Sequence, residues 1–262
     1  MSIFSPNTKE ELKTAVDLWC DNELVALEKY GPINSWNVSK IKDMSRLFES
    51  KINFNSDISN WDVSNVKNMK YLFLYASSFN QDISNWNVCN VTDMTCMFFC
   101  AKSFNVDISL WDVSNVKNMK SMFWSASSFN QYISLWDVSN VIDMIHMFHS
   151  AESFNQDISN WDVSNVKYIA GMFHKATCFN QDISSWDVSN VKDMNGMFYN
   201  AVSFNQDLSN WDISNVSDMI DMFCYASSFN QDISSWNVSN VKYNRDIFKN
   251  CNIHEEYKPK FQ

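Results

Sequence analysis

The stretch FNSDISNWDVSNVKNMKYLFLYASS, residues 54–78, decides the fold, because the chain repeats it with no insertion or deletion before the next copy begins. Nine tryptophans occupy the same position of successive copies, 25 residues apart: Trp36, Trp61, Trp86, Trp111, Trp136, Trp161, Trp186, Trp211 and Trp236. Self-similarity at a fixed period of this size indicates stacked units, each of which buries its apolar face against its neighbours. We therefore expect one elongated repeat array, a solenoid, rather than two globular domains.

The first half of the unit is predicted to contain a short strand. Four apolar residues follow the spacing of the core positions of a leucine-rich repeat, namely Ile58, Trp61, Val63 and Val66. In a parallel strand from Trp61 to Val63, these two side chains point into the core and Asp62 points outward, because strand side chains alternate. The tryptophans are thus expected to form a buried column, the Trp column, that fixes the register between units.

The second half of the unit is predicted to be a short helix. Asn65 resembles a helix N-cap, and apolar residues follow it at helical intervals: Val66, Met69, Phe73 and Ala76. Helices need about 10 Å between neighbours and parallel strands about 4.8 Å, so the array is expected to curve with its strands on the inner side. The predicted fold class is an α/β repeat: a right-handed, leucine-rich-repeat-like solenoid with one short parallel strand and one short helix in each 25-residue unit.

The chain is predicted to have three parts. Residues 1–30 form a helical amino-terminal cap, residues 31–253 form the nine-unit solenoid, and residues 254–262 form a polar tail that closes it. In the cap, Thr8 resembles a helix N-cap and is followed by apolar residues at helical spacing: Leu12, Ala15, Val16 and Trp19. A second short helix is expected from Glu23 to Glu28.

Composition and charge restrict the class of partner. The formal net charge of −10 disfavours nucleic acid and anionic membrane surfaces, both of which repel an acidic protein. The amino terminus lacks the pattern of a secretion signal, and no apolar run is long enough to cross a membrane. We therefore expect a cytoplasmic protein with no membrane insertion, while association with a virion or a cell surface stays open. The seven cysteines lie in unrelated positions of the repeat and predict neither disulfides nor a zinc site.

The unit FNQDISNWDVSNV, as written at residues 154–166, with the Met-x-x-Met-Phe segment that follows close variants of it in residues 179–198 and 204–223, resembles the BspA-like surface-protein repeats, also described as the DUF285 family. The resemblance covers residues 33 to about 250. It implies a repeat protein without an assigned activity, and for the bacterial surface members it implies binding to host or matrix proteins. The first residues of the sequence do not follow the secretion-signal pattern of those surface members, so we expect a departure from their role.

A column of polar residues that follows the tryptophans is the first candidate site. Its aspartates, the Asp row, are Asp62, Asp112, Asp137, Asp162, Asp187 and Asp212, and its remaining members are Asn37, Asn87 and Asn237. Carboxylates on adjacent units repel one another, and two explanations could offset that cost. Each Asp accepts hydrogen bonds from the following residues as an Asx turn, or the row binds cations or a basic partner. Asparagine at three positions favours the first explanation.

A second candidate site lies in two neighbouring units where polar positions become apolar. Four residues carry this change: Val106, Leu110, Tyr132 and Leu135. Exposed apolar groups on a polar surface are typical of partner-binding sites. Drift in a tolerant array is the alternative explanation.

No constellation of catalytic residues stands out, so we expect neither an enzyme nor a cofactor. His149 and His174 share one position in adjacent units, but no further ligand is placed beside them, so we expect no metal site. The predicted function is a non-enzymatic scaffold that recognises a protein partner on a curved surface, with self-association left open. The alternative is a cell- or virion-surface attachment protein, with glycan binding by the polar and aromatic inner face.

Overall fold

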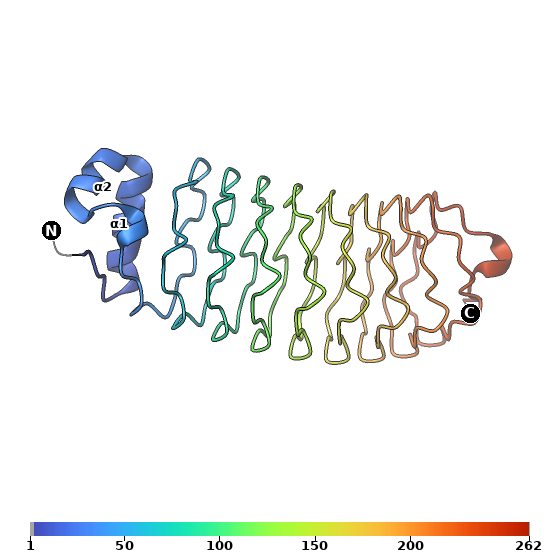
Figure 1. Cartoon of the computed structure of the whole chain (residues 1–262). Helices are drawn as coiled ribbons and strands as arrows, with labels where there is room; N and C mark the ends of the chain where they lie inside the picture. Colours follow the sequence, from blue (N-terminus) through green and yellow to red (C-terminus); the bar gives the residue numbers. More distant parts are fainter. Residues whose placement is uncertain (1–2, 262) are drawn as a thin grey trace.

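The computed structural model describes residues 3–261, and it consists of a stack of coils, one for each unit, closed at the amino-terminal end by two helices (Figure 1). Helix α1 (Lys9–Asp21) begins at Thr8, whose side chain accepts a hydrogen bond from the Glu11 N–H. Helix α2 (Glu23–Tyr30) ends at Gly31, which has a positive φ of 74°. Both expected helices are therefore confirmed. Two short 3-10 helices, η1 (Ile33–Ser35) and η2 (Glu255–Tyr257), lie at the two ends of the array.

Each coil is a succession of tight turns. In the unit of residues 54–78, backbone N–H groups bond to the carbonyl three residues earlier at five places: Trp61 to Ile58, Val66 to Val63, Leu72 to Met69, Leu74 to Tyr71 and Ala76 to Phe73. Tyr71 and Tyr75, the third residues of two of these turns, both have a φ of 59°, as a type II turn requires. The equivalent residues of the other units also have positive φ, and only Gly171 and Gly196 among them are glycines.

The predicted α/β fold class is wrong. Among the described residues between Trp36 and Ile253 there is no α-helix and no β-strand. The parallel pairing that exists is limited to isolated bridges of one residue per coil, and it lies at the position of Asn68 rather than in the run from Trp61 to Val63. The structure is thus a stack of turns, not a solenoid with one strand and one helix in each unit.

The spacing between coils explains the absence of repeat helices. The rings of Phe73 and Phe98 are stacked with their centroids 5.6 Å apart, and those of Trp136 and Trp161 are 6.4 Å apart. Packed helices need about 8–10 Å between their axes, so coils at this spacing have no room for one helix each. The spacing is similar on the two sides of the core, which removes the physical reason for the expected curvature.

Buried aromatic columns run through the whole stack. The nine residues of the Trp column are 2–5% exposed, as predicted, and the indole N–H of each later tryptophan bonds to a carbonyl of the preceding coil, as Trp61 does to Ile33 at 2.8 Å. The helix N-cap predicted at Asn65 is wrong, because its side chain instead donates to the Ser39 carbonyl one coil earlier. Polar side chains therefore join neighbouring coils beside the apolar core.

None of the helices found between residues 3 and 261 has the length and apolar character needed to cross a membrane.

Candidate functional site

The Asp row lies on the surface, and each of its carboxylates closes a local turn. Asp62 Oδ1 accepts hydrogen bonds from the Ser64 N–H at 3.1 Å and from the Ser64 hydroxyl at 2.6 Å. Asn37 makes the same pair of contacts with Ser39, at 3.2 and 2.7 Å. An Asx turn needs an acceptor oxygen and not a charge, so the two residue types are interchangeable here. The backbone Ser N–H to Asp Oδ1 bond recurs at the other aspartates of the row, Asp112, Asp137, Asp162, Asp187 and Asp212.

A second row of such turns was not singled out from the sequence. Asp57 accepts from the Ser59 N–H at 2.9 Å, and the same contact recurs at Asp82, Asp107, Asp157, Asp182, Asp207 and Asp232. These hydrogen bonds lower the pKa of Asp57 and, in the Asp row, that of Asp162. The sequence signal was present, because both rows share the text Asp-x-Ser. The two rows give the coils an acidic surface whose carboxylates each have one oxygen engaged.

The apolar candidate site is partly exposed. Leu110 is 84% exposed, Leu135 is 68% exposed and Tyr132 is 47% exposed. Leu110 and Leu135 occupy the same position of adjacent coils, and we call them the leucine pair. Val106 differs, because its half-buried side chain packs against the core and so contributes little to this surface. The structure therefore reduces the four-residue candidate to the leucine pair with Tyr132 beside it in the sequence.

The histidines belong to a surface column of stacked rings. The rings of Trp124 and His149 are 3.8 Å apart, those of His149 and His174 are 4.2 Å apart, and those of His174 and Tyr199 are 4.4 Å apart. Stacked imidazoles lie face to face, so their nitrogens do not converge on one point as metal ligands must. In the described part of the chain, no group of three or more His, Cys, Asp or Glu side chains is arranged to hold a metal ion.

Burial weakens the basicity of these imidazoles. It lowers the pKa of His149 to about 3, assisted by the neighbouring positive charge of His174, and it lowers the pKa of His174 to about 4. Burial also lowers the pKa of His146, whose ring meets Trp124 edge-on at 4.8 Å. The stack is consequently neutral near pH 7 and packs as an aromatic column.

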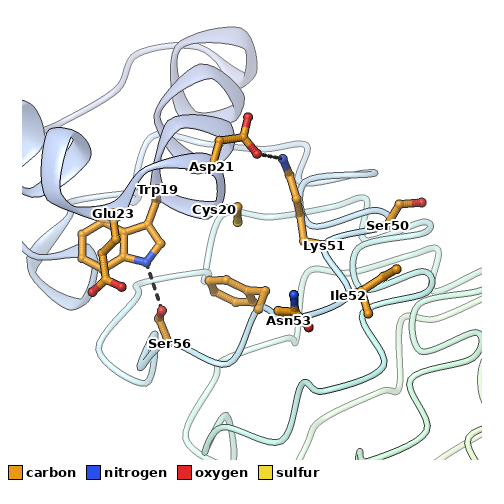
Figure 2. Close-up of a pocket in the computed structure, with 10 residues that line it drawn as sticks. Trp19, Cys20, Asp21, Glu23, Ser50, Lys51, Ile52, Asn53 and Ser56 are labelled. Atoms are coloured by element: carbon orange, nitrogen blue, oxygen red, sulfur yellow. Dashed lines mark hydrogen bonds and ion pairs between the residues drawn. The ribbon is translucent and has the colours of Figure 1, made fainter.

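A cleft of ≈ 370 Å³ lies between α1 and the first coils (Figure 2). On one side of it the Trp19 indole donates to the Ser56 hydroxyl at 2.9 Å. On the other side Lys51 contacts the carboxylates of Asp17 at 2.9 Å and Asp21 at 3.3 Å, and Figure 2 shows Lys51 and Asp21 facing one another. No sequence pattern pointed to this cleft, because it joins the non-repetitive cap to the repeats.

The cleft does not present an activated nucleophile. Cys20 is half-buried in it, and burial raises the pKa of its thiol to about 11. The thiol is therefore protonated at neutral pH, whereas the thiolate is the reactive form. The ammonium group of Lys51 is held by its two carboxylate partners, so these residues bind the cap to the array.

One family model matches the chain three times, over residues 22–123, 105–201 and 181–257, and it is described as a Mycoplasma protein of unknown function, DUF285. The matched segments together contain every residue of the Trp column. No curated protein matches the chain.

Proposed function

The chain belongs to the DUF285 family, and from that premise we propose that it is a non-catalytic scaffold that binds a protein partner through the leucine pair. The observation that carries the proposal is the exposure of Leu110 and Leu135, at 84% and 68%, on adjacent coils. The same position holds asparagine or serine in other coils: Asn60, Asn85, Asn160, Ser185, Asn210 and Ser235. The array thus presents apolar side chains at one place along an otherwise polar column.

Burial of these side chains would supply binding free energy. Covering one leucine contributes about 1.5–3 kcal/mol, and a few such residues commonly dominate an interface. Asp112 and Asp137 lie two residues after Leu110 and Leu135 in the same coils, with exposed side chains. The partner that fits is therefore a protein with an apolar contact surface flanked by basic side chains.

The proposal is tested with the double variant Leu110→Asn, Leu135→Asn, which restores the residue type of the neighbouring coils. A partner captured by the wild-type chain from its native host is identified and purified, and its affinity is measured for both chains by calorimetry. We expect the double variant to bind at least ~10-fold more weakly, because it removes the apolar contact. Its unfolding midpoint should not fall, because both leucines are exposed.

Asn160→Ser is the matched control, since it exchanges two residues that this column already contains. It should bind the partner with the wild-type affinity. Equal affinity of the wild-type chain and the double variant would disprove the role of the leucine pair.

A further inference from the structure

In the half of each coil that follows the Asp row, alternate backbone N–H groups donate to the next coil, after one N–H, that of Lys67 in the second unit, donates to the preceding coil. In the second unit, the N–H groups of Met69, Tyr71, Phe73 and Tyr75 donate to carbonyls of the next coil at 2.8–3.0 Å. The donors belong to the earlier coil and the acceptors to the later one, and the same direction recurs along the stack. We call this part of each coil the turn-rich half. Its aligned peptide groups leave a row of donors at the carboxyl-terminal end of the array.

The last coil exposes that row. Within residues 3–261, the backbone N–H groups of Asn244, Asp246, Phe248 and Asn250 have no hydrogen-bond acceptor. Asn244, Asp246 and Asn250 are exposed, and Phe248 is half-buried. Asn244 stands where seven of the preceding coils place a buried methionine, and this departure is the sequence signal for an open end. We call these four N–H groups the donor edge.

The carboxyl-terminal tail covers the other half of the last coil. The His254 N–H donates to Asn230 Oδ1 at 2.9 Å, and the Tyr257 carbonyl accepts from the Ile233 N–H at 3.0 Å. These contacts continue the stack beside Phe229 and the Trp column. In Figure 1 the tail, with η2, lies at the red end of the array, opposite the helices. The tail thus covers the core, and the ammonium group of Lys258 lies 5.6 Å from the ring centroid of Phe248, while residues 251–261 accept none of the four donor-edge N–H groups.

The opposite end of the array is closed by α1. Its apolar residues Leu12, Ala15 and Val16 are fully buried in the same core cluster as the first coil, and Lys9 reaches the carboxylate of Asp43 at 3.3 Å. Another copy of the chain cannot place its donor edge against the first coil while α1 occupies that position. Head-to-tail stacking of copies is thus disfavoured, so a second copy of the array is not the occupant that we consider.

The last coil carries three basic side chains and one acidic side chain around the donor edge. Lys242 and Arg245 are exposed and, among the described residues, form no ion pair, while Lys249 lies 3.5 Å from Asp246. Aligned N–H groups without acceptors add partial positive charge, as they do at the end of a helix. The chain has a net charge of −10 and the preceding coil contributes Asp218 and Asp221, whereas the last coil itself offers Lys242 and Arg245 to a negatively charged ligand.

We propose that the donor edge binds an acidic peptide segment of a partner protein, which takes the turn conformation of an interior coil and adds to the array as a further coil. Inside the array, four such donors are accepted by carbonyls at alternate residues of the next coil, those of Asp93, Thr95, Met97 and Phe99 for the second unit, so a segment that repeats this path satisfies the donor edge. Open backbone edges are templates for such pairing. The carboxylates of the segment would lie near Lys242 and Arg245. This surface is separate from the leucine pair and does not depend on it.

Amide hydrogen exchange, followed residue by residue by NMR, tests the proposal. The probe is a blocked nine-residue peptide of alternating Asp and Val. Without the peptide, the amides of the donor edge should exchange faster than those of Asp221, Phe223 and Tyr225, which are bonded to the last coil at 2.8–3.0 Å. Saturating peptide should slow exchange at the donor edge at least ~10-fold, because its carbonyls accept these hydrogen bonds.

Charge reversal supplies the second readout. The variant Lys242→Glu, Arg245→Glu should weaken peptide binding at least ~10-fold, whereas Lys117→Glu, at the position equivalent to Lys242 in an interior coil, should leave binding unchanged. Equal weakening by both variants would show a general charge effect and overturn the proposal.

Three results count against the donor edge as a peptide site. The first is unchanged exchange of its amides in the presence of saturating peptide. The second is equal protection by inorganic phosphate alone, which would show a simple anion site. The third is protection that depends on protein concentration without peptide, which would show pairing between copies of the chain.

Discussion

At the scale of single residues, two glycines at the same position of the turn have different structural roles. Gly171 and Gly196 have φ values of 60° and 56°, and other coils place non-glycine residues there at similar values. Left-handed backbone alone therefore does not require glycine. A Cβ at Gly171 would lie 2.1 Å from Nδ1 of His146, whereas a Cβ at Gly196 would lie 3.3 Å from its nearest contact, in His174. Gly171 thus provides the space in which the His146 ring lies.

Gly171→Ala should destabilise the chain more than Gly196→Ala. Both changes carry the same left-handed strain of roughly 1 kcal/mol. Gly171→Ala adds an overlap with His146, for which we expect about 1–3 kcal/mol more in the free energy of unfolding. Chemical denaturation of the two variants measures the difference.

His146→Ser tests the cause of that difference, because the preceding coil has Ser121 at this position. In the Gly171→Ala background it should recover most of the additional loss. Equal destabilisation by the two glycine substitutions would contradict the assigned role of Gly171.

At the scale of one structural element, the ring column of Trp124, His149, His174 and Tyr199 couples folding to pH. The pKa values of His149 and His174 in the folded chain, about 3 and about 4, lie below the unfolded value of 6.5. Between those values the unfolded chain binds more protons than the folded chain. The free energy of unfolding therefore falls as the pH decreases from about 6.5 towards 4.

Charged groups around the ring column change the size of this pH dependence, but the histidines remain its cause. His146 and Lys175 add positive charge that further disfavours protonation of His149 and His174. Burial raises the pKa of Asp143 and of Asp193, so the folded chain gains protons there and opposes the histidines at the acidic end of the range. The hydroxyl of Ser150 lies 3.0 Å from Nδ1 of His149 and carries no charge.

The double variant His149→Phe, His174→Phe should lose stability less steeply between pH 6.5 and pH 4 than the wild-type chain. Phenylalanine already occupies this column at Phe99, so the stack is preserved. Denaturation midpoints measured across the range give the slope. His254→Phe, in the exposed tail, is the control and should leave the slope unchanged. A wild-type midpoint that does not change between pH 6.5 and pH 4.5 would refute the coupling.

At the scale of the whole molecule, folding requires that equivalent positions of neighbouring coils stay aligned, 25 residues apart in the sequence. Deletion of residues 154–178 removes one complete coil and brings equivalent positions of the flanking coils together. His146 then faces Gly196 in place of Gly171, and His149 faces Tyr199. We expect a folded, cooperative array of lower stability and a smaller denaturant m-value, because one coil and one interface are lost.

Deletion of residues 154–165 is the matched control, since it removes about half a coil. It would place polar positions of one coil against the buried columns of the next, so we expect no cooperative unfolding transition. A cooperative transition in this control, or its loss in the full-coil deletion, would contradict the requirement for register.

The sequence by itself determined which residues are buried and how they stack. The Trp column, the inward direction of Trp61 and Val63, the N-cap at Thr8 and the turns closed by the Asp row all follow from local spacing or local hydrogen bonding. Such features depend on residues that are near in sequence or repeated at a fixed period, so they can be predicted from the sequence pattern.

Only the tertiary structure decided the backbone conformation of the units and the location of the open surfaces. Val66, Met69, Phe73 and Ala76 are buried at helical intervals, yet their half of the coil bonds to the next coil, because coils less than 7 Å apart leave no room for helices. The cleft under α1 and the donor edge of the last coil arise where the period stops. A repeat pattern specifies the contact between two identical coils, and it carries no information about an end that has no next coil.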